Sequence, residues 1–298
     1  MRRIIKLLLA LAVVGAGVGW WLTAPTFIRA ADLPDHAADL AHGEQVFAEA
    51  GCASCHAASD AKGDDKLILS GGLAFKTDFG TFYAPNISPG SEGIAGWSTA
   101  DLVTAMQMGV RPDGAHYYPA FPFTSYIRMD MTDIIDLKAY LDTLQASDVA
   151  SKSHDVGFPF NIRRGLGMWK LLFLSPDPVI AVADDPQLQR GRQLVEGAAH
   201  CSECHTPRNP IGGLDKSKWL AGGPNPDGEG RIPNITPHDQ GIGGWTASDI
   251  AYYLETGFTP DFDSAGGAMA KVIENTSKLP AADRDAIAAY LKAVPAIE

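Results

Sequence analysis

The stretch GCASCHAASD, residues 51–60, places two cysteines three positions apart and a histidine directly after the second. The stretch HCSECHTPRN, residues 200–209, repeats this pattern with Cys201, Cys204 and His205. The two motifs together contain all four cysteines of the 298-residue chain. A disulfide, a zinc site, a redox dithiol and a covalently anchored cofactor all use closely spaced cysteines, and the surrounding sequence decides between them.

The context of the motifs favours covalent attachment of haem. A disulfide across two residues closes too small a loop to stabilise much, and zinc needs four ligands, whereas neither motif has a second Cys/His pair nearby. A redox dithiol needs a βαβ context, which the sequence does not indicate, while Cys-x-x-Cys-His is the attachment signature of c-type haem. We therefore predict two haem c groups, with these thioether and proximal residues: Cys52, Cys55 and His56 for the first, and Cys201, Cys204 and His205 for the second.

An internal repeat extends beyond the motifs. HGEQVFAEAGCASCH (42–56) matches RGRQLVEGAAHCSECH (190–205), and APNISPGSEGIAGWSTADL (84–102) matches IPNITPHDQGIGGWTASDI (232–250). The near-constant offset between them, about 149 residues, indicates two homologous domains in tandem, because solenoid repeats have much shorter periods. The predicted parts of the chain are an N-terminal segment at 1–30, a first domain at 36–146, a linker at 147–185 and a second domain at 186–298.

Each predicted domain has the same coarse secondary structure. A helix of about ten residues precedes each Cys motif, and a long Gly/Pro/Asn-rich stretch without strand alternation follows it. A short helix then begins at a capping box, Ser98 with Asp101 or Thr246 with Asp249. A last amphipathic helix is predicted at 132–144 and at 281–294. Three short helices and long loops need a large apolar group to pack around, so we predict an all-α protein folded around its haems.

The first residues combine a basic start with an apolar run. MRRIIKLLLALAVVGAGVGWWLTAP contains 21 residues between positions 4 and 24, close to the ~20 that a membrane-spanning helix requires. No small-x-small cleavage site follows closely, which favours an uncleaved anchor, with a cleaved signal peptide as the alternative. Both hypotheses place the rest of the chain on the periplasmic side of a bacterial inner membrane, anchored in the first case and soluble in the second.

The charge distribution limits the partners. The formal net charge is −11, and residues 1–30 carry four cations and no acid, so the rest of the chain carries −15. Such an acidic surface repels phosphate backbones, and we predict no nucleic-acid partner. A basic patch on a protein partner would be attracted to it.

Further segments point to a known family. They are FGTFYAPNISP (79–89) with IPNITP (232–237), GIAGW (93–97) with GIGGW (241–245), and GGAMAKVIENTSKLPAADRDAIAAYL (266–291). With the two haem motifs, the chain resembles the dihaem cytochromes c that serve membrane-bound alcohol, sugar and aldehyde dehydrogenases as electron acceptors. The resemblance covers about residues 40–293. It implies two class I cytochrome c domains, each with three to four short helices, and transfer of electrons from a dehydrogenase to a quinone or a terminal oxidase.

The sixth ligand of each iron determines what the haem does, since methionine gives a closed electron carrier and an open face permits catalysis. In the second domain the resemblance places the ligand at Met269, in the Gly-rich loop AGGAMAKV, 21 residues before Tyr290. A methionine that only packs in the core is the alternative at that position.

The first domain departs from the family pattern. Related subunits often carry Tyr-Pro-Ala-Met where this chain has YPAF, so Phe121 stands at the expected ligand position. We predict Met129, eleven residues before Tyr140, as the ligand of the first haem. Met131, His116, another methionine or an open site are the alternatives.

Two functional hypotheses follow. An electron carrier performs no bond chemistry of its own. A dihaem redox enzyme of the peroxidase or thiosulfate-oxidising type keeps one haem open or unusually ligated, and the missing Tyr-Pro-Ala-Met supports it. A haem-based sensor would need a signalling domain, and the sequence indicates none.

The linker contains FPFNIRRGLGMWKLLFLSPDP (158–178). Two interpretations apply to its apolar residues. They pack against both domains as an ordered connector, or they form an interface with the membrane surface or a partner subunit, because cations are interspersed among them.

Overall fold

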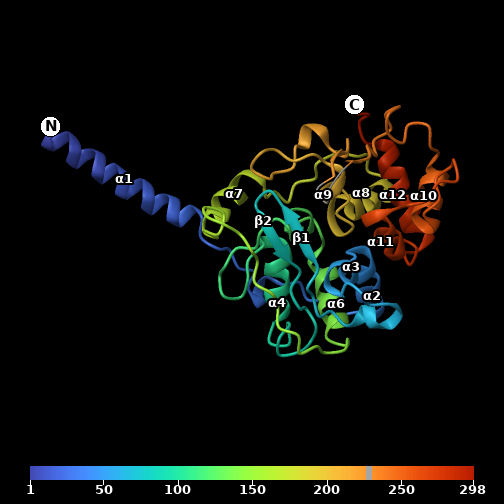
Figure 1. Ribbon diagram of the computed structural model, residues 1–298, viewed down its shortest axis with the longest axis horizontal. Helices are drawn as coiled ribbons and strands as arrows, with labels where there is room; N and C mark the ends of the chain where they lie inside the picture. Colours follow the sequence, from blue (N-terminus) through green and yellow to red (C-terminus); the bar gives the residue numbers. More distant parts are fainter. Residues whose placement is uncertain (226–229) are drawn as a thin grey trace.

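The computed structural model describes residues 1–225 and 230–298. Helices dominate it, as predicted, and they surround two hydrophobic cores. In Figure 1 the long helix α1 (Arg2–Leu22) projects from a folded body that contains both cores. The α-helices of the body are α2 (Leu40–Glu49), α3 (Cys52–His56), α4 (Thr99–Val103), α5 (Phe123–Tyr126), α6 (Met131–Leu141), α7 (Gly165–Phe173), α8 (Pro186–Arg192), α9 (Ser202–His205), α10 (Ala247–Thr256), α11 (Gly267–Thr276) and α12 (Ala281–Ala293).

Shorter elements complete the body. Two π-helical segments extend α4 and α8, namely η3 (Thr104–Met108) and η4 (Gln193–Ala198). The 3₁₀ segments are η1 (Ala30–Asp32), η2 (Gly63–Leu67) and η5 (Lys216–Lys218). In the described part of the chain the strands are β1 (Ala74–Thr77), β2 (Gly80–Tyr83), β3 (Gly223–Pro224) and β4 (Arg231–Ile232).

The first core forms where α2 crosses α6. A glycine makes the close crossing possible, since a Cβ at Gly43 would lie 2.2 Å from the Asp136 carbonyl oxygen. Phe47 of α2 packs on Tyr140 of α6, with ring centroids 5.4 Å apart. The fully buried Val46 joins this core, so the helix before the first Cys motif is held by its apolar face.

The second core repeats the arrangement with α8 and α12. A Cβ at Gly191 would lie 2.0 Å from the Ala286 carbonyl oxygen, and Tyr290 is fully buried. The predicted capping boxes are confirmed in both halves, because the Ser98 hydroxyl accepts from the Asp101 amide and the Thr246 hydroxyl accepts from the Asp249 amide.

The prediction that the chain has no strands was wrong. β1 pairs with β2 antiparallel, with Ala74 opposite Tyr83, and β3 pairs with β4. The first hairpin turns at Gly80, whose φ of +130° favours glycine. Strands of two to four residues are too short to show the alternation that indicates a sheet in sequence.

Helix bounds also differ from the prediction. The last helix of the first half begins and ends earlier, at Met131–Leu141, whereas α12 ends one residue short of the predicted 294. The Gly-rich loop around Met269 is helical from Gly267 onward, because Gly266 and Gly267 supply the turn that starts α11. The linker contains the helix α7, which favours an ordered connector.

A buried charged network joins the two halves. Arg190 of α8 donates to Asp283 of α12, with Nε to Oδ1 at 2.9 Å, and to Glu49 of α2. Gln45 donates to both carboxylates, at 2.9 Å to Glu49 and 2.8 Å to Asp283. Because Glu49 is almost completely buried, this network ties the helix before the first Cys motif to the second core.

Candidate functional site

Each Cys motif is entered through a residue with a left-handed backbone. Gly51, with φ of +59°, turns the chain from α2 into α3. His200 takes the equivalent place before α9 with φ of +40°, which is unfavourable for a residue with a side chain. Its ring packs against Tyr126 with centroids 5.6 Å apart, and this contact helps hold the turn.

The two motif histidines are oriented in the same way. The Nδ1 of His56 lies 2.8 Å from the Pro85 carbonyl oxygen, and the Nδ1 of His205 lies 2.8 Å from that of Pro233. A carbonyl only accepts, so Nδ1 carries the proton and Nε2 keeps its lone pair for a metal. Burial lowers the pKa of both rings, which keeps them neutral and able to ligate.

A second pair of contacts closes each motif. The Gly71 amide donates to the His56 carbonyl at 2.6 Å, and the Gly222 amide donates to the His205 carbonyl at 2.7 Å. Both glycines have positive φ, +75° and +74°, and a Cβ at either would lie about 2.5 Å from the backbone beside the proline. Each loop therefore holds its histidine, and the backbone geometry is the same in both halves.

The cysteines fit thioether attachment better than zinc or redox chemistry. All four lie in the described part of the chain, and none forms a disulfide. Burial raises the pKa of Cys52 to about 12, of Cys55 to about 11 and of Cys201 to about 12, so these thiols stay protonated. Among residues 1–225 and 230–298, no group of three or more His, Cys, Asp and Glu side chains could hold a metal ion. Two thiols beside an imidazole with a free Nε2 match the donors that haem c uses.

Met269 belongs to the second core. It lies in the first turn of α11, half-buried, and packs on the same core as Cys201 and Trp245. Its role as the sixth ligand stays a prediction.

The first motif has a different set of candidates. Met129 is buried in the first core, against which Cys52 also packs. It directly precedes Asp130, the N-cap of α6, and in the second half Leu279 holds that position before Pro280. Met129 thus occupies the place of a leucine in the repeat.

The alternatives to Met129 are oriented as follows. Both ring nitrogens of His116 are engaged, Nε2 with the Thr23 carbonyl at 3.1 Å and Nδ1 with the Lys170 ammonium at 3.0 Å. Phe121 stacks between Tyr117 and Tyr126, and Met131 begins α6. The structure therefore directs His116 toward the end of α1 and the linker.

The repeated asparagines brace loops. The Asn86 side chain donates to the carbonyls of Ser147 and Val149 at 3.0 and 2.8 Å. The Asn234 side chain donates to the Ile297 carbonyl at 2.6 Å. In each half this contact fastens the Pro-Asn-Ile segment, which carries the proline that orients the motif histidine, to the chain that follows the last helix.

The two motifs approach each other where the halves meet. Tyr126 contacts the His200 ring, and its hydroxyl lies 3.4 Å from the Ala50 carbonyl. The Asn275 amide of α11 donates to the Ser54 hydroxyl of α3 at 2.8 Å. Sequence reasoning missed Tyr126, His200 and Asn275, although His200 could have been noticed as the residue that replaces Gly51 in the repeat.

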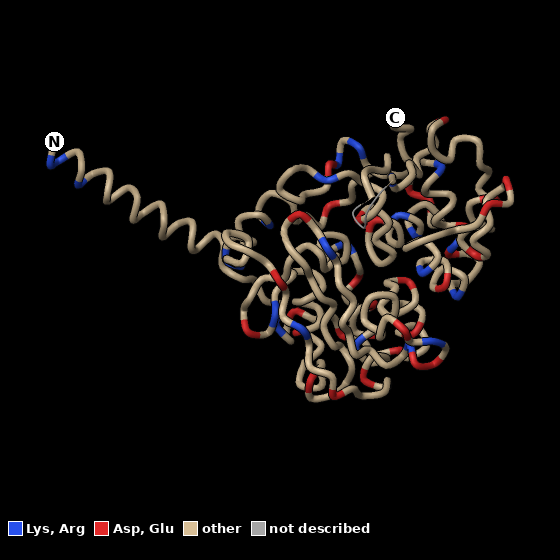
Figure 2. Tube along the Cα trace, in the orientation of Figure 1, with Lys and Arg blue, Asp and Glu red and all other residues tan. Residues whose placement is uncertain are grey.

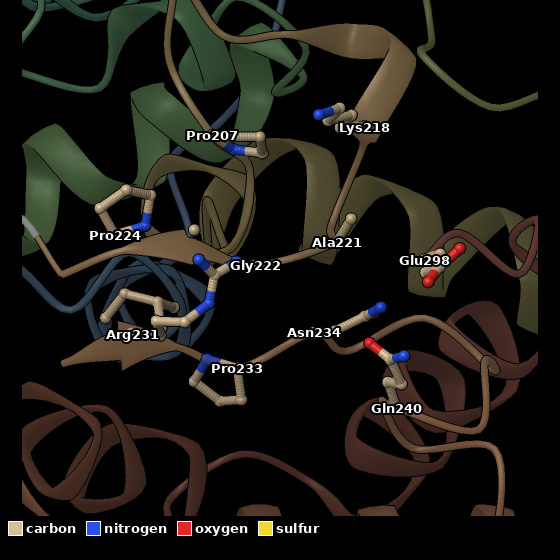
Figure 3. Close-up of a pocket in the computed structure, with 12 residues that line it drawn as sticks. Pro207, Lys218, Ala221, Gly222, Pro224, Arg231, Pro233, Asn234, Gln240 and Glu298 are labelled. Carbon is tan, nitrogen blue, oxygen red and sulfur yellow. The ribbon is translucent and has the colours of Figure 1, made fainter.

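A cavity of about 400 Å³ lies beside Pro233, whose carbonyl holds His205. Figure 3 shows the strand segments β3 and β4 and the chain end at Glu298 around it. Lys218 and Arg231 line it together with Glu298, so its wall carries both signs of charge. The described residues that line the cavity include Pro233 but none of the predicted haem ligands. The cavity therefore lies beside the second site and not within it.

Comparison with known proteins agrees with this geometry. The family model for cytochrome c matches residues 40–145, which include α2, the first Cys motif and α6. The fold and the motifs define a c-type cytochrome. The dihaem cytochrome c-type protein of Cereibacter sphaeroides is 54% identical over 299 residues, covering 100% of both chains. The chain belongs to the family of dihaem c-type cytochromes, and it carries two haem c groups.

Other relatives are subunits of larger enzymes. The cytochrome subunit of fructose dehydrogenase from Gluconobacter japonicus is 39% identical over 267 residues, covering 88% of this chain and 54% of the relative. The cytochrome c subunit of alcohol dehydrogenase (quinone) from Gluconobacter oxydans is 33% identical over 297 residues, covering 94% of this chain and 61% of the relative. The chain is thus an electron-transfer cytochrome that spans a little over half the length of these subunits.

Proposed function

We propose that this protein is an electron carrier, anchored by α1 on the periplasmic side of a bacterial inner membrane, which passes electrons from a dehydrogenase to the respiratory chain. The observation that carries this proposal is the approach of the two Cys motifs, because Tyr126 contacts both His200, directly before the second motif, and Ala50, two residues before the first. Electron transfer requires closely spaced redox groups, and these contacts bring the starts of the two motifs near each other. Each core is then one class I cytochrome c domain, with the bounds 36–146 and 186–298.

Haem c supplies one-electron chemistry at its iron, and the residues of this chain hold it. The four thiols would form the thioether bonds, and the neutral Nε2 atoms of His56 and His205 would ligate the irons, because their Nδ1 atoms are held by proline carbonyls. Met129 and Met269 are the proposed sixth ligands. Methionine on both irons would leave neither face open, which suits a carrier.

The partner follows from the relatives and from the charge. Relatives are named as cytochrome subunits of fructose and alcohol dehydrogenases, so we propose a dehydrogenase as the donor and a quinone or terminal oxidase as the acceptor. The charge of −15 outside residues 1–30 favours encounter with a basic docking surface. In Figure 2 the positions of Asp and Glu, coloured red, are distributed along the chain over the whole folded body.

Helix α1 supports the anchored location. It has a mean hydropathy of 2.0 over its most apolar window, and none of that window is buried in the protein. Its 21 residues span about 31 Å at 1.5 Å per residue, close to the thickness of a hydrocarbon core. A cleaved signal peptide, which would leave a soluble periplasmic protein, is the alternative.

A second function rests on a specific observation. Met129 stands where the repeat has Leu279, and Phe121 stands where the family resemblance leads us to expect a methionine. If Met129 only packs, the first haem has an open face, and the protein becomes a dihaem redox enzyme of the peroxidase or thiosulfate-oxidising type.

Three leucine variants separate the two functions. Met129→Leu and Met269→Leu keep the side-chain volume and remove the sulfur, and Met168→Leu is the control because that side chain is about half exposed in the linker. We expect Met269→Leu to turn the second haem high-spin and open to carbon monoxide, and Met129→Leu to do the same to the first haem. Optical spectra with and without carbon monoxide measure both effects, and the control should leave them unchanged.

Two results would contradict the proposal. If Met129→Leu leaves the spectra of both haems unchanged, Met129 packs as Leu279 does and is no ligand. If the unmodified protein binds carbon monoxide at one haem and turns over peroxide or thiosulfate, the enzyme hypothesis replaces the carrier.

A further inference from the structure

The linker helix α7 has the reverse of the usual polarity. Its buried positions include Lys170, whose ammonium donates inward to the carbonyls of Met108 and Gly109 at 2.6 Å each. Its outer face presents Met168, Leu171 and Leu172, which are 49, 54 and 67% exposed. A surface helix in water normally places charge outward and apolar side chains inward. The outer face of α7 is therefore built for an apolar environment.

Neighbouring segments extend this apolar face. Phe158 and Ile162 precede α7 and are 81 and 53% exposed. Ile211 lies beside it and is also exposed, since the Trp169 indole of α7 donates to the Ile211 carbonyl at 2.8 Å. Residues 156–174 contain no acid, although the chain as a whole is acidic, and their three cations are engaged within the protein. We call the exposed side chains of residues 158–172, with Ile211, the apolar foot.

The apolar foot is fastened to the end of the membrane-spanning helix. The Arg164 guanidinium lies over the Trp20 ring at 4.1 Å and donates to the Trp20 carbonyl. Its Nε donates to the Thr23 hydroxyl at 3.1 Å. A Cβ at Gly167 would lie 2.5 Å from the Thr23 carbonyl oxygen, so α7 and the end of α1 are in direct contact. Figure 1 shows α7 at the point where α1 enters the folded body.

This contact sets the depth of α7 relative to a bilayer. The 21 residues of α1 match the hydrocarbon thickness, so Trp20, Trp21 and Thr23 reach the far interface. Thr23 is buried in protein, and His116 holds its carbonyl, so the connection between α1 and the body is fixed. A segment packed on residues 20–23 is therefore held at the interface, where apolar side chains and cations are both stable.

We propose that the apolar foot inserts into the outer leaflet interface of the same membrane that α1 crosses, and thereby fixes the orientation of both haems to the bilayer. This inference rests on the proposed anchored location. Continuity with α1, the exposed apolar face and the absence of acidic residues from 156–174 favour a lipid surface over a protein subunit.

The test uses the full haem-loaded chain in vesicles of phosphatidylethanolamine and phosphatidylglycerol. All four native cysteines are consumed by haem attachment, so a nitroxide label attaches only to a cysteine introduced at Leu172. Power saturation then compares collisions with oxygen, which concentrates in lipid, and with a water-soluble nickel chelate. Val13→Cys in the middle of α1 and Lys278→Cys, an exposed site before α12, are the matched controls.

We expect the Leu172→Cys label to collide several-fold more with oxygen than with the chelate, between the values of the Val13→Cys and Lys278→Cys labels. One result would overturn the insertion of the apolar foot and leave the anchor intact. In that result the Val13→Cys label lies in lipid, but the Leu172→Cys label collides with the chelate as often as the Lys278→Cys label does. Protein that does not sediment with the vesicles would overturn the anchor itself. Protection of Leu172→Cys that arises only after a dehydrogenase is added would assign the face to a protein partner and also overturn the proposal.

Discussion

The network that joins the halves allows a sharp prediction on Arg190. The variant Arg190→Met keeps the apolar stem and removes the guanidinium, which contacts both Asp283 and Glu49. Gln45 is then the remaining donor to two carboxylates, of which Glu49 is 1% and Asp283 is 11% exposed at the side chain. Leaving a buried charge without its partner costs about 3–5 kcal/mol of unfolding free energy.

The loss of stability caused by Arg190→Met must depend on pH. Burial already raises the pKa of Glu49, although Arg190 opposes the shift, so removing Arg190 raises the pKa further. A carboxyl with a folded-state pKa above its unfolded value binds extra protons when folded, and its contribution to stability is lost as pH rises through that pKa. We therefore expect the loss to be largest at neutral pH and smaller at mildly acidic pH.

Thermal unfolding of the haem-loaded protein, followed by circular dichroism at neutral and mildly acidic pH, measures this loss of stability. The expected drop in midpoint at neutral pH is roughly 6–15 °C, from about 2–3 °C per kcal/mol for a chain of this size. Arg111→Met is the control, since Arg111 pairs with Asp113 at the surface, where such pairs contribute only about 0–1 kcal/mol. Adding Glu49→Gln to Arg190→Met should restore part of the midpoint. An Arg190→Met midpoint no lower than that of the control, or a loss equal at both pH values, would refute the reasoning.

Two further predictions concern α8 and α6. Gly191→Ala would gain about 1 kcal/mol in an isolated helix, but the Cβ clash with the Ala286 carbonyl should reverse the sign and cost about 1–3 kcal/mol or more. Unfolding midpoints check this, and Gly165→Ala is the control without a clash, because its Cβ meets nothing and it should not lower the midpoint. Burial raises the pKa of Asp133 to about 6, so its folded form binds extra protons between about pH 4 and 6 and its contribution falls as pH rises. Asp133→Asn should therefore be the more stable protein at neutral pH, by at most about 3 kcal/mol, and a midpoint-against-pH curve parallel to that of the unmodified protein would contradict this.

The repeated motifs were predictable because their chemistry is local. Cys-x-x-Cys-His needs only adjacent positions on one helical turn, and the crossing helices carry their own periodicity. The capping boxes at Ser98 and Thr246 are equally local, and the structure has both. The short hairpins were missed because their pairing partners are too few to leave a pattern in sequence.

The sequence by itself determined the haem attachment chemistry, the helix-rich repeat and the apolar helix α1, since each depends on neighbouring residues or on a regular period. The tertiary structure alone decided that both ring nitrogens of His116 are engaged, that Met129 is buried in the first core, and that the two Cys motifs approach each other where the halves meet. It also decided that Lys170 turns inward while Leu172 turns outward. The physical reason is that these features depend on which surfaces meet across the interface, and contacts between residues far apart in the chain leave no local pattern.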